Sequence, residues 1–122
     1  MTVDEYFEYN KKGAKVYRNP MKHALLEIPK IESRSEKGAV YDVLSVGQFW
    51  SPSIPIVTIN EHGFPILYRL PDWYLKWAKT SQFLSSKGHN SFPSKVEFGY
   101  IIPDKQFYAE ILDDQGKYLN EL

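Results

Sequence analysis

The sequence contains no cysteine, and this absence excludes a disulfide framework and any metal site built on thiolates. It also lacks a run of about eighteen apolar residues, the length that a helix needs to span a bilayer. The N-terminus has neither the basic region nor the apolar region of a signal peptide. We therefore expect a cytoplasmic protein that makes no membrane contact.

Motifs of well-known chemistry are missing too. There is no glycine-rich phosphate loop and no G-x-S-x-G, and the histidines stand at 23, 62 and 89, without metal-ligand spacing. We predict no cofactor, no metal site and no catalytic residue. The alternative is a small enzyme with a site around His62 or His89, both in expected loops, in which His89 would act as an acid-base group with Asp72 or Glu97 nearby.

What the sequence does contain is an ordinary globular composition with many aromatic residues. Its 122 residues are 43% hydrophobic and 25% charged, which predicts one globular domain over residues 1–122. The net charge is zero, which argues against a protein that coats nucleic acid by bulk charge. Aromatic residues reach 16%, and such side chains serve both cores and binding surfaces.

The first third of the chain predicts short elements. A capping box and a glycine stop predict a helix over Thr2–Gly13, and a brief strand follows at Ala14–Arg18. Residues 20–28 fit a helix, because an asparagine N-cap precedes a proline, and the rival interpretation is a strand at Ala24–Ile28. The polar segment 31–38 is expected to be a mobile loop.

The rest of the chain alternates apolar and polar residues in the manner of strands. Gly63 suits the turn of a first hairpin, and a Pro-Asp pair suits the turn of a second. The expected strands are Ala39–Val46, Ile54–Asn60, Phe64–Leu70, Lys95–Ile102 and Phe107–Leu112, with Lys117–Leu122 as a short final strand or a frayed end. Because proline cannot donate to a ladder, a free edge or a bulge is expected near Pro52, Pro55 and Pro65.

The resulting fold class is α+β. We expect a mainly antiparallel sheet of about five strands, with an N-terminal helix and one longer amphipathic helix (about 71–87) packed on one face. In that helix, steps of about 100° place Trp73 and Trp77 in an apolar stripe that should pack on the sheet. Phe83 falls instead on the polar side among Lys76 and Lys79, where the following loop, Gly88–Ser94, is expected to cover it.

The leading functional prediction is a non-catalytic binding or regulatory protein that contacts another macromolecule, and a protein partner is favoured. The aromatic excess and the strand edges implied by the prolines support it. Tyr68 and Arg69 are candidate interface residues, because aromatic and arginine side chains are common hot spots. Self-association through an edge around Ile54–Leu70 is a further expectation.

The alternative partner is single-stranded nucleic acid. Lys76, Lys79, Phe83 and Lys87 would offer one ring for a base and cations for phosphates. Arg18, Lys22 or Lys30 would extend that surface, and binding would then weaken steeply with salt.

Overall fold

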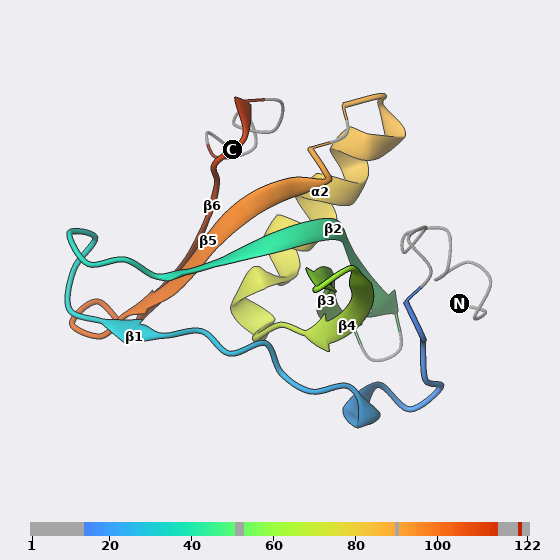
Figure 1. Ribbon diagram of the computed structural model, residues 1–122, viewed down its shortest axis with the longest axis horizontal. Helices are drawn as coiled ribbons and strands as arrows, with labels where there is room; N and C mark the ends of the chain where they lie inside the picture. Colours follow the sequence, from blue (N-terminus) through green and yellow to red (C-terminus); the bar gives the residue numbers. More distant parts are fainter. Residues whose placement is uncertain (1–13, 51–52, 90, 115–119, 121–122) are drawn as a thin grey trace.

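The computed structural model describes residues 14–50, 53–89, 91–114 and 120, which form an α+β fold dominated by one mixed sheet (Figure 1). The elements in chain order are η1 (Pro20–Lys22), β1 (Lys30–Ile31), β2 (Ala39–Trp50), β3 (Ser53–Glu61), β4 (Phe64–Arg69), η2 (Asp72–Tyr74), α2 (Leu75–Ser86), β5 (Ser94–Ile101) and β6 (Gln106–Ile111). The predicted fold class is confirmed. The predicted N-terminal helix lies outside the described residues.

The sheet runs in the order β6, β5, β2, β3 and β4, and all of these neighbours are antiparallel. β1 is the exception, since it pairs parallel with β5. β2 pairs with β5 only as far as Phe98, and β1 pairs with the next part of β5, where Lys30 lies opposite Tyr100. The register of β2 on β3 shifts between Val43 and Ser45, a bulge that lies away from the prolines near which a bulge or free edge was expected.

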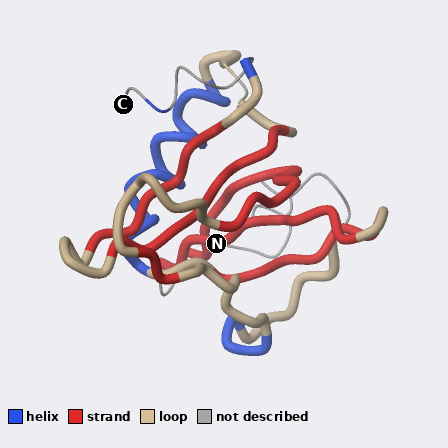
Figure 2. The backbone as a smooth tube through the Cα atoms, turned by 60° about the vertical axis from the view of Figure 1, so that its left-hand side comes forward, coloured by secondary structure: helices blue, strands red, loops and turns tan. Residues whose placement is uncertain are grey.

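Helix α2 covers one face of the sheet and forms the main core with it (Figure 2). Tyr74 and Ala78 are fully buried there, and Trp77 packs beside them. In β3 and β5 the core residues of the sheet alternate, as the period of two requires, and in β2 the bulge places them three positions apart. They are Val43 and Val46 of β2, Val57 and Ile59 of β3, Val96 and Phe98 of β5, and Ile111 of β6. No helix among the described residues is long and apolar enough to cross a membrane.

Trp73 does not belong to that buried stripe, contrary to the prediction. It is 46% exposed and touches Tyr74 and Phe107 with its ring. The reason is local: Trp73 lies in η2, and a 3₁₀ turn advances the chain by about 120° per residue rather than 100°. The side chain is therefore rotated toward the rim of the helix interface.

The opposite face has a smaller core that the start of the chain covers. Ala14, Ile56 and Leu67 are buried together, with Val16 and Phe49 packed against them. Residues 14–18 thus lie against the sheet without pairing in it, so the brief strand predicted there is wrong. Side-chain burial, rather than a hydrogen-bonded ladder, keeps this segment extended.

Residues 20–28 are mostly extended, so the helix predicted there is also wrong. The predicted cap is present, because Asn19 Oδ1 accepts from the Met21 N–H at 3.0 Å, but only the short η1 turn follows. The chain then makes a single parallel bridge between Leu25 and Arg69. Arg69 N–H donates to the Ala24 carbonyl at 2.8 Å and Leu26 N–H donates to the Arg69 carbonyl at 2.9 Å. These long-range bonds replace the local bonds of a helix.

His23 fastens this segment to β4 from inside the fold. Its side chain is 5% exposed, and its Nε2 accepts a hydrogen bond from the Tyr17 N–H at 3.0 Å. Burial lowers the pKa of His23, the nearby charge of Arg69 lowers it further, and a hydrogen bond to the Leu67 backbone opposes both. The neutral imidazole therefore joins residues 17 and 23 to the edge of the sheet.

Candidate binding surface

The outward side of α2 displays three lysines and one phenylalanine in a line. Lys76, Lys79, Phe83 and Lys87 succeed one another by steps of three or four residues, which places them on adjacent turns of one helix side. All four are exposed. We call this set the α2 stripe.

No acidic residue balances the lysines within the helix. The sequence of α2, LKWAKTSQFLSS, contains neither aspartate nor glutamate. Surface helices often stabilise themselves with acid-base pairs three or four residues apart, and α2 has none. The stripe is consequently a cationic surface along the whole length of α2.

Phe83 is the unusual member of the stripe, because it is 61% exposed. The described residues of the loop Gly88–Ser94 leave it uncovered, although the sequence predicted a cover. Lys87 Nζ lies 5.7 Å from the ring centroid, a weak cation–π contact at an exposed site. Full burial of such a ring stabilises by about 1.5–3 kcal/mol. Because Phe83 is 61% exposed, the larger part of that free energy is left for a partner to gain.

Lys22, one of the early basic residues, does not extend the stripe. Lys22 Nζ lies 5.9 Å from the centroid of the Tyr17 ring, and that ring contacts His23. His23 in turn contacts Phe49, which packs in the small core on the face opposite α2. The sheet therefore separates Lys22 from the stripe.

Tyr68 and Arg69, the other predicted interface residues, lie on β4 and bond within the molecule. The Tyr68 hydroxyl donates to Glu61, and this hydrogen bond is the main reason that the pKa of Tyr68 is raised to about 12. Arg69 Nε donates to the His23 carbonyl at 2.7 Å. Both side chains are half-buried, so they are placed to stabilise the fold around the start of the chain.

A pocket of about 390 Å³ opens where β2 and β3 separate, since their pairing begins only at Val43 and Ile59. It is lined by Val40, Tyr41, Asp42, Ile59, Asn60, Glu61, His62 and Lys95.

Several polar groups that line this pocket bond to neighbouring residues. Asp42 lies directly opposite Lys95 in the register of β2 and β5, and Asn60 Nδ2 lies 3.5 Å from an Asp42 carboxylate oxygen. Glu61 accepts from Tyr68. His62 is exposed in the hairpin turn, at φ +53°, and His89 is exposed in the loop after α2.

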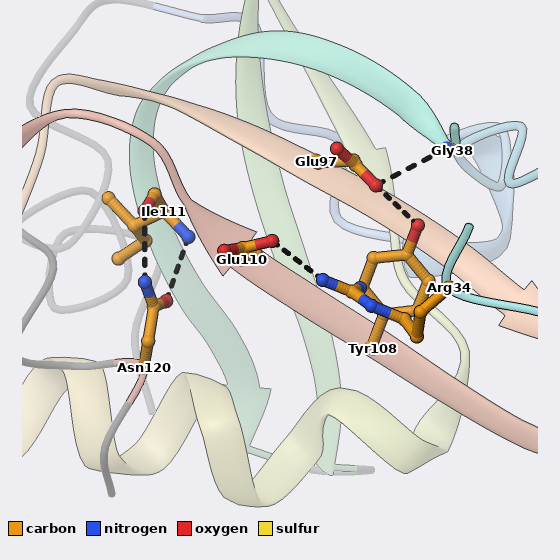
Figure 3. A network of polar contacts seen from close by, with 7 residues as sticks. All are labelled: Arg34, Gly38, Glu97, Tyr108, Glu110, Ile111 and Asn120. Atoms are coloured by element: carbon orange, nitrogen blue, oxygen red, sulfur yellow. Dashed lines mark hydrogen bonds and ion pairs between the residues drawn. The ribbon is translucent and has the colours of Figure 1, made fainter. Parts of the chain in front are cut away.

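A second polar network, which the sequence did not predict, joins the segment 31–38 to β5 and β6 (Figure 3). Arg34 lies 2.6 Å from a Glu110 oxygen and 3.7 Å above the centre of the Tyr108 ring. The Tyr108 hydroxyl donates to Glu97 at 2.6 Å, and burial together with this bond raises the pKa of Tyr108 to about 12. The segment predicted as a mobile loop is therefore anchored through Arg34.

Glycine at position 99 makes this network possible. A Cβ at Gly99 would lie 2.4 Å from the Tyr108 ring, so any other residue would displace the ring that packs across it. The only hint in the sequence is a glycine inside a strand pattern, which indicates close approach without naming the neighbour.

Known proteins offer no family for this chain. Neither the family models, nor the curated proteins, nor the solved structures contained a match. Within the described residues there is no group of three or more histidine, aspartate or glutamate side chains placed to hold a metal ion. The function is therefore inferred from the charge and exposure of the surface.

Proposed function

We propose that this protein is a non-catalytic binding protein and that the α2 stripe contacts an acidic segment of a protein partner. The observation that carries the proposal is Phe83, 61% exposed on a helix that contains Lys76 and Lys79 and no acid, with Lys87 at its C-cap. Lysines at a helix surface are ordinary, but a large ring among them is not required for solubility or for packing. Acidic side chains flanking one apolar anchor would match this surface in both charge and shape.

A protein partner fits the stripe better than single-stranded nucleic acid does. Non-specific single-strand platforms stack several successive bases on several rings, and the α2 stripe supplies one. The stripe has three cations, and Lys22 lies across the sheet from it. Few phosphate contacts would therefore be made, and affinity would be low.

The test compares three forms of the full chain as bait for capture from cells that make the protein naturally. The first is wild type and the second carries Lys76→Gln, Lys79→Gln, Phe83→Ser and Lys87→Gln. The third is a matched control with Lys22→Gln, Lys30→Gln, Lys37→Gln and Phe64→Ser, in which Phe64 is 70% exposed at the hairpin.

We expect a protein partner whose capture survives nuclease treatment. It should bind the wild type and the control but not the stripe variant. Equal recovery by the stripe variant, or no recovery by wild type, would contradict the proposal. Recovery that disappears on nuclease treatment, and that falls with salt by roughly 0.7 log units per log unit of salt for each phosphate contact, would favour the nucleic-acid alternative instead.

A further inference from the structure

The two outer strands of the sheet differ in how their edges are closed. On β4, Arg69 exchanges hydrogen bonds with Ala24 and Leu26, and the ring of His23 bonds the Leu67 backbone. The backbone of Pro65 also faces outward, but Pro65 has no N–H that could donate a hydrogen bond. The edge of β4 around Ile54–Leu70, where self-association was expected, is thus largely occupied by the protein's own chain.

The register shows which groups of β6 face outward. Leu112 N–H donates to the Lys95 carbonyl at 2.8 Å, so the residues opposite Lys95, Glu97 and Gly99 direct their backbone toward β5. Tyr108 and Glu110 are among these residues. It follows that Phe107, Ala109 and Ile111 direct their N–H and C=O groups away from the sheet.

The outward backbone groups of one of these residues, Ile111, are already hydrogen-bonded. The side chain of Asn120 accepts from the Ile111 N–H at 2.8 Å and donates to the Ile111 carbonyl at 2.9 Å, as a neighbouring strand would. Figure 3 shows this pair of bonds at the end of β6. Within the described residues, nothing bonds the outward N–H and C=O groups of Phe107 and Ala109. Both residues are half-buried, so four backbone groups stand at an open edge.

We infer that β6 pairs with β6 of a second copy of this chain, antiparallel and centred on Tyr108. This register places Phe107 opposite the partner's Ala109 and Ala109 opposite the partner's Phe107. It forms four hydrogen bonds from the residues that are free on each copy. A register centred on Phe107 would need Lys105, whose N–H donates to Ile102 within the turn. A register centred on Ala109 would need Ile111, which Asn120 occupies.

The side chains suit the same register. On the face toward α2, the large Phe107 would lie against the small Ala109 of the other copy. On the opposite face, Gln106 would lie beside Glu110, an amide donor beside a carboxylate. Tyr108 leans over Gly99 of its own sheet and is held there by Arg34, which leaves room at the axis for the second Tyr108. A second copy therefore satisfies both the backbone and the side chains of this edge.

The test uses Ala109→Pro, because proline removes an outward N–H and leaves the bonds from β6 to β5 intact. Ala109→Ser, which keeps the N–H, is the matched control. By sedimentation equilibrium we expect a concentration-dependent dimer for wild type and for Ala109→Ser. Loss of two hydrogen bonds per dimer should raise the dissociation constant of Ala109→Pro about tenfold or more. A wild-type chain that stays monomeric at millimolar concentration, or an Ala109→Pro dimer as tight as wild type, would overturn the inference.

Hydrogen exchange on wild type provides a readout that needs no variant. The amides of Phe107 and Ala109 should gain protection as protein concentration rises, while the inward amide of Tyr108 stays protected throughout. If Ala109→Pro fails to fold, the hydrogen-exchange experiment tests the dimer by itself. Exchange at Phe107 and Ala109 that does not depend on protein concentration would overturn the pairing.

Discussion

The two sides of α2 both carry aromatic residues, which are buried on one side and exposed on the other. The inner side, together with Tyr74 at the end of η2, places Trp77 and Ala78 against the sheet. The ring centroids of Tyr74 and Trp77 lie 5.6 and 5.8 Å from that of Phe98. The outer side places Phe83 in solvent among lysines. The difference teaches that aromatic content alone says little about function in this chain. An aromatic residue indicates a binding surface only where the fold leaves it without a packing role.

The largest effect should come from the inner side. Tyr74→Ala removes the largest fully buried side chain under the helix, and we expect a loss of about 3–5 kcal/mol in the free energy of unfolding. Denaturant unfolding followed by circular dichroism measures it. A loss below about 1 kcal/mol would mean that α2 is not held by this side chain.

A smaller loss in the free energy of unfolding is expected when His23 is replaced, because His23 is also buried and hydrogen-bonded within the fold. His23→Ala leaves the Tyr17 N–H without its acceptor and opens the segment that covers β4, so we expect about 1–3 kcal/mol. The exposed His62 is the matched comparison, and His62→Ala should change stability far less. Equal effects would contradict the role given to His23.

Acid should act through the same residue. Because burial lowers the pKa of His23 in the folded chain, the unfolded chain binds more protons just below its ordinary value of about 6.5. Stability is therefore complete above that pH and falls as the pH drops toward the folded pKa. Urea unfolding from pH 7.5 to 5 should show this slope in wild type and a smaller slope in His23→Gln, and an unchanged slope would be evidence against it.

Removing one hydroxyl makes a finer test of the inner side. Tyr74 donates to the Tyr108 carbonyl at 2.7 Å, and Tyr74→Phe keeps the ring while losing this bond. We expect about 1 kcal/mol of destabilisation. The same thermal or chemical unfolding experiment measures it, and no change at all would show that the ring alone does the work.

The outer side should show the smallest effect on folding. Phe83→Ser should change the free energy of unfolding by less than about 0.5 kcal/mol, since the ring packs little within the fold. Phe64→Ser, on a ring that is 70% exposed, should behave alike. A loss above 1 kcal/mol for Phe83→Ser would assign Phe83 to the fold and remove the basis of the binding proposal.

Local patterns predicted most of the framework. The alternation at Val96 and Phe98 located β5, and the proline and aspartate at residues 71 and 72 located the start of the helical region. The α2 stripe was also predictable, because helical spacing alone puts Lys76, Lys79 and Phe83 on one side. Its exposure was not, since that depends on where the following loop lies.

The remaining features depend on contacts between distant residues. Residues 20–28 carry a helix-like pattern, yet Arg69 and His23 hold them extended. The place of Tyr108 over Gly99 follows from the register of β5 and β6, which no single segment specifies. The open edge of β6 required the same register and the bonds made by Asn120. Such features can be read only from the assembled sheet.

The most direct test of the α2 stripe is the affinity of its captured protein partner for purified Phe83→Ser and Phe64→Ser, measured by titration calorimetry. The proposal predicts that Phe83→Ser weakens binding about tenfold or more, as loss of an interface anchor does, while Phe64→Ser binds as wild type does. Equal affinities for the two variants would contradict it.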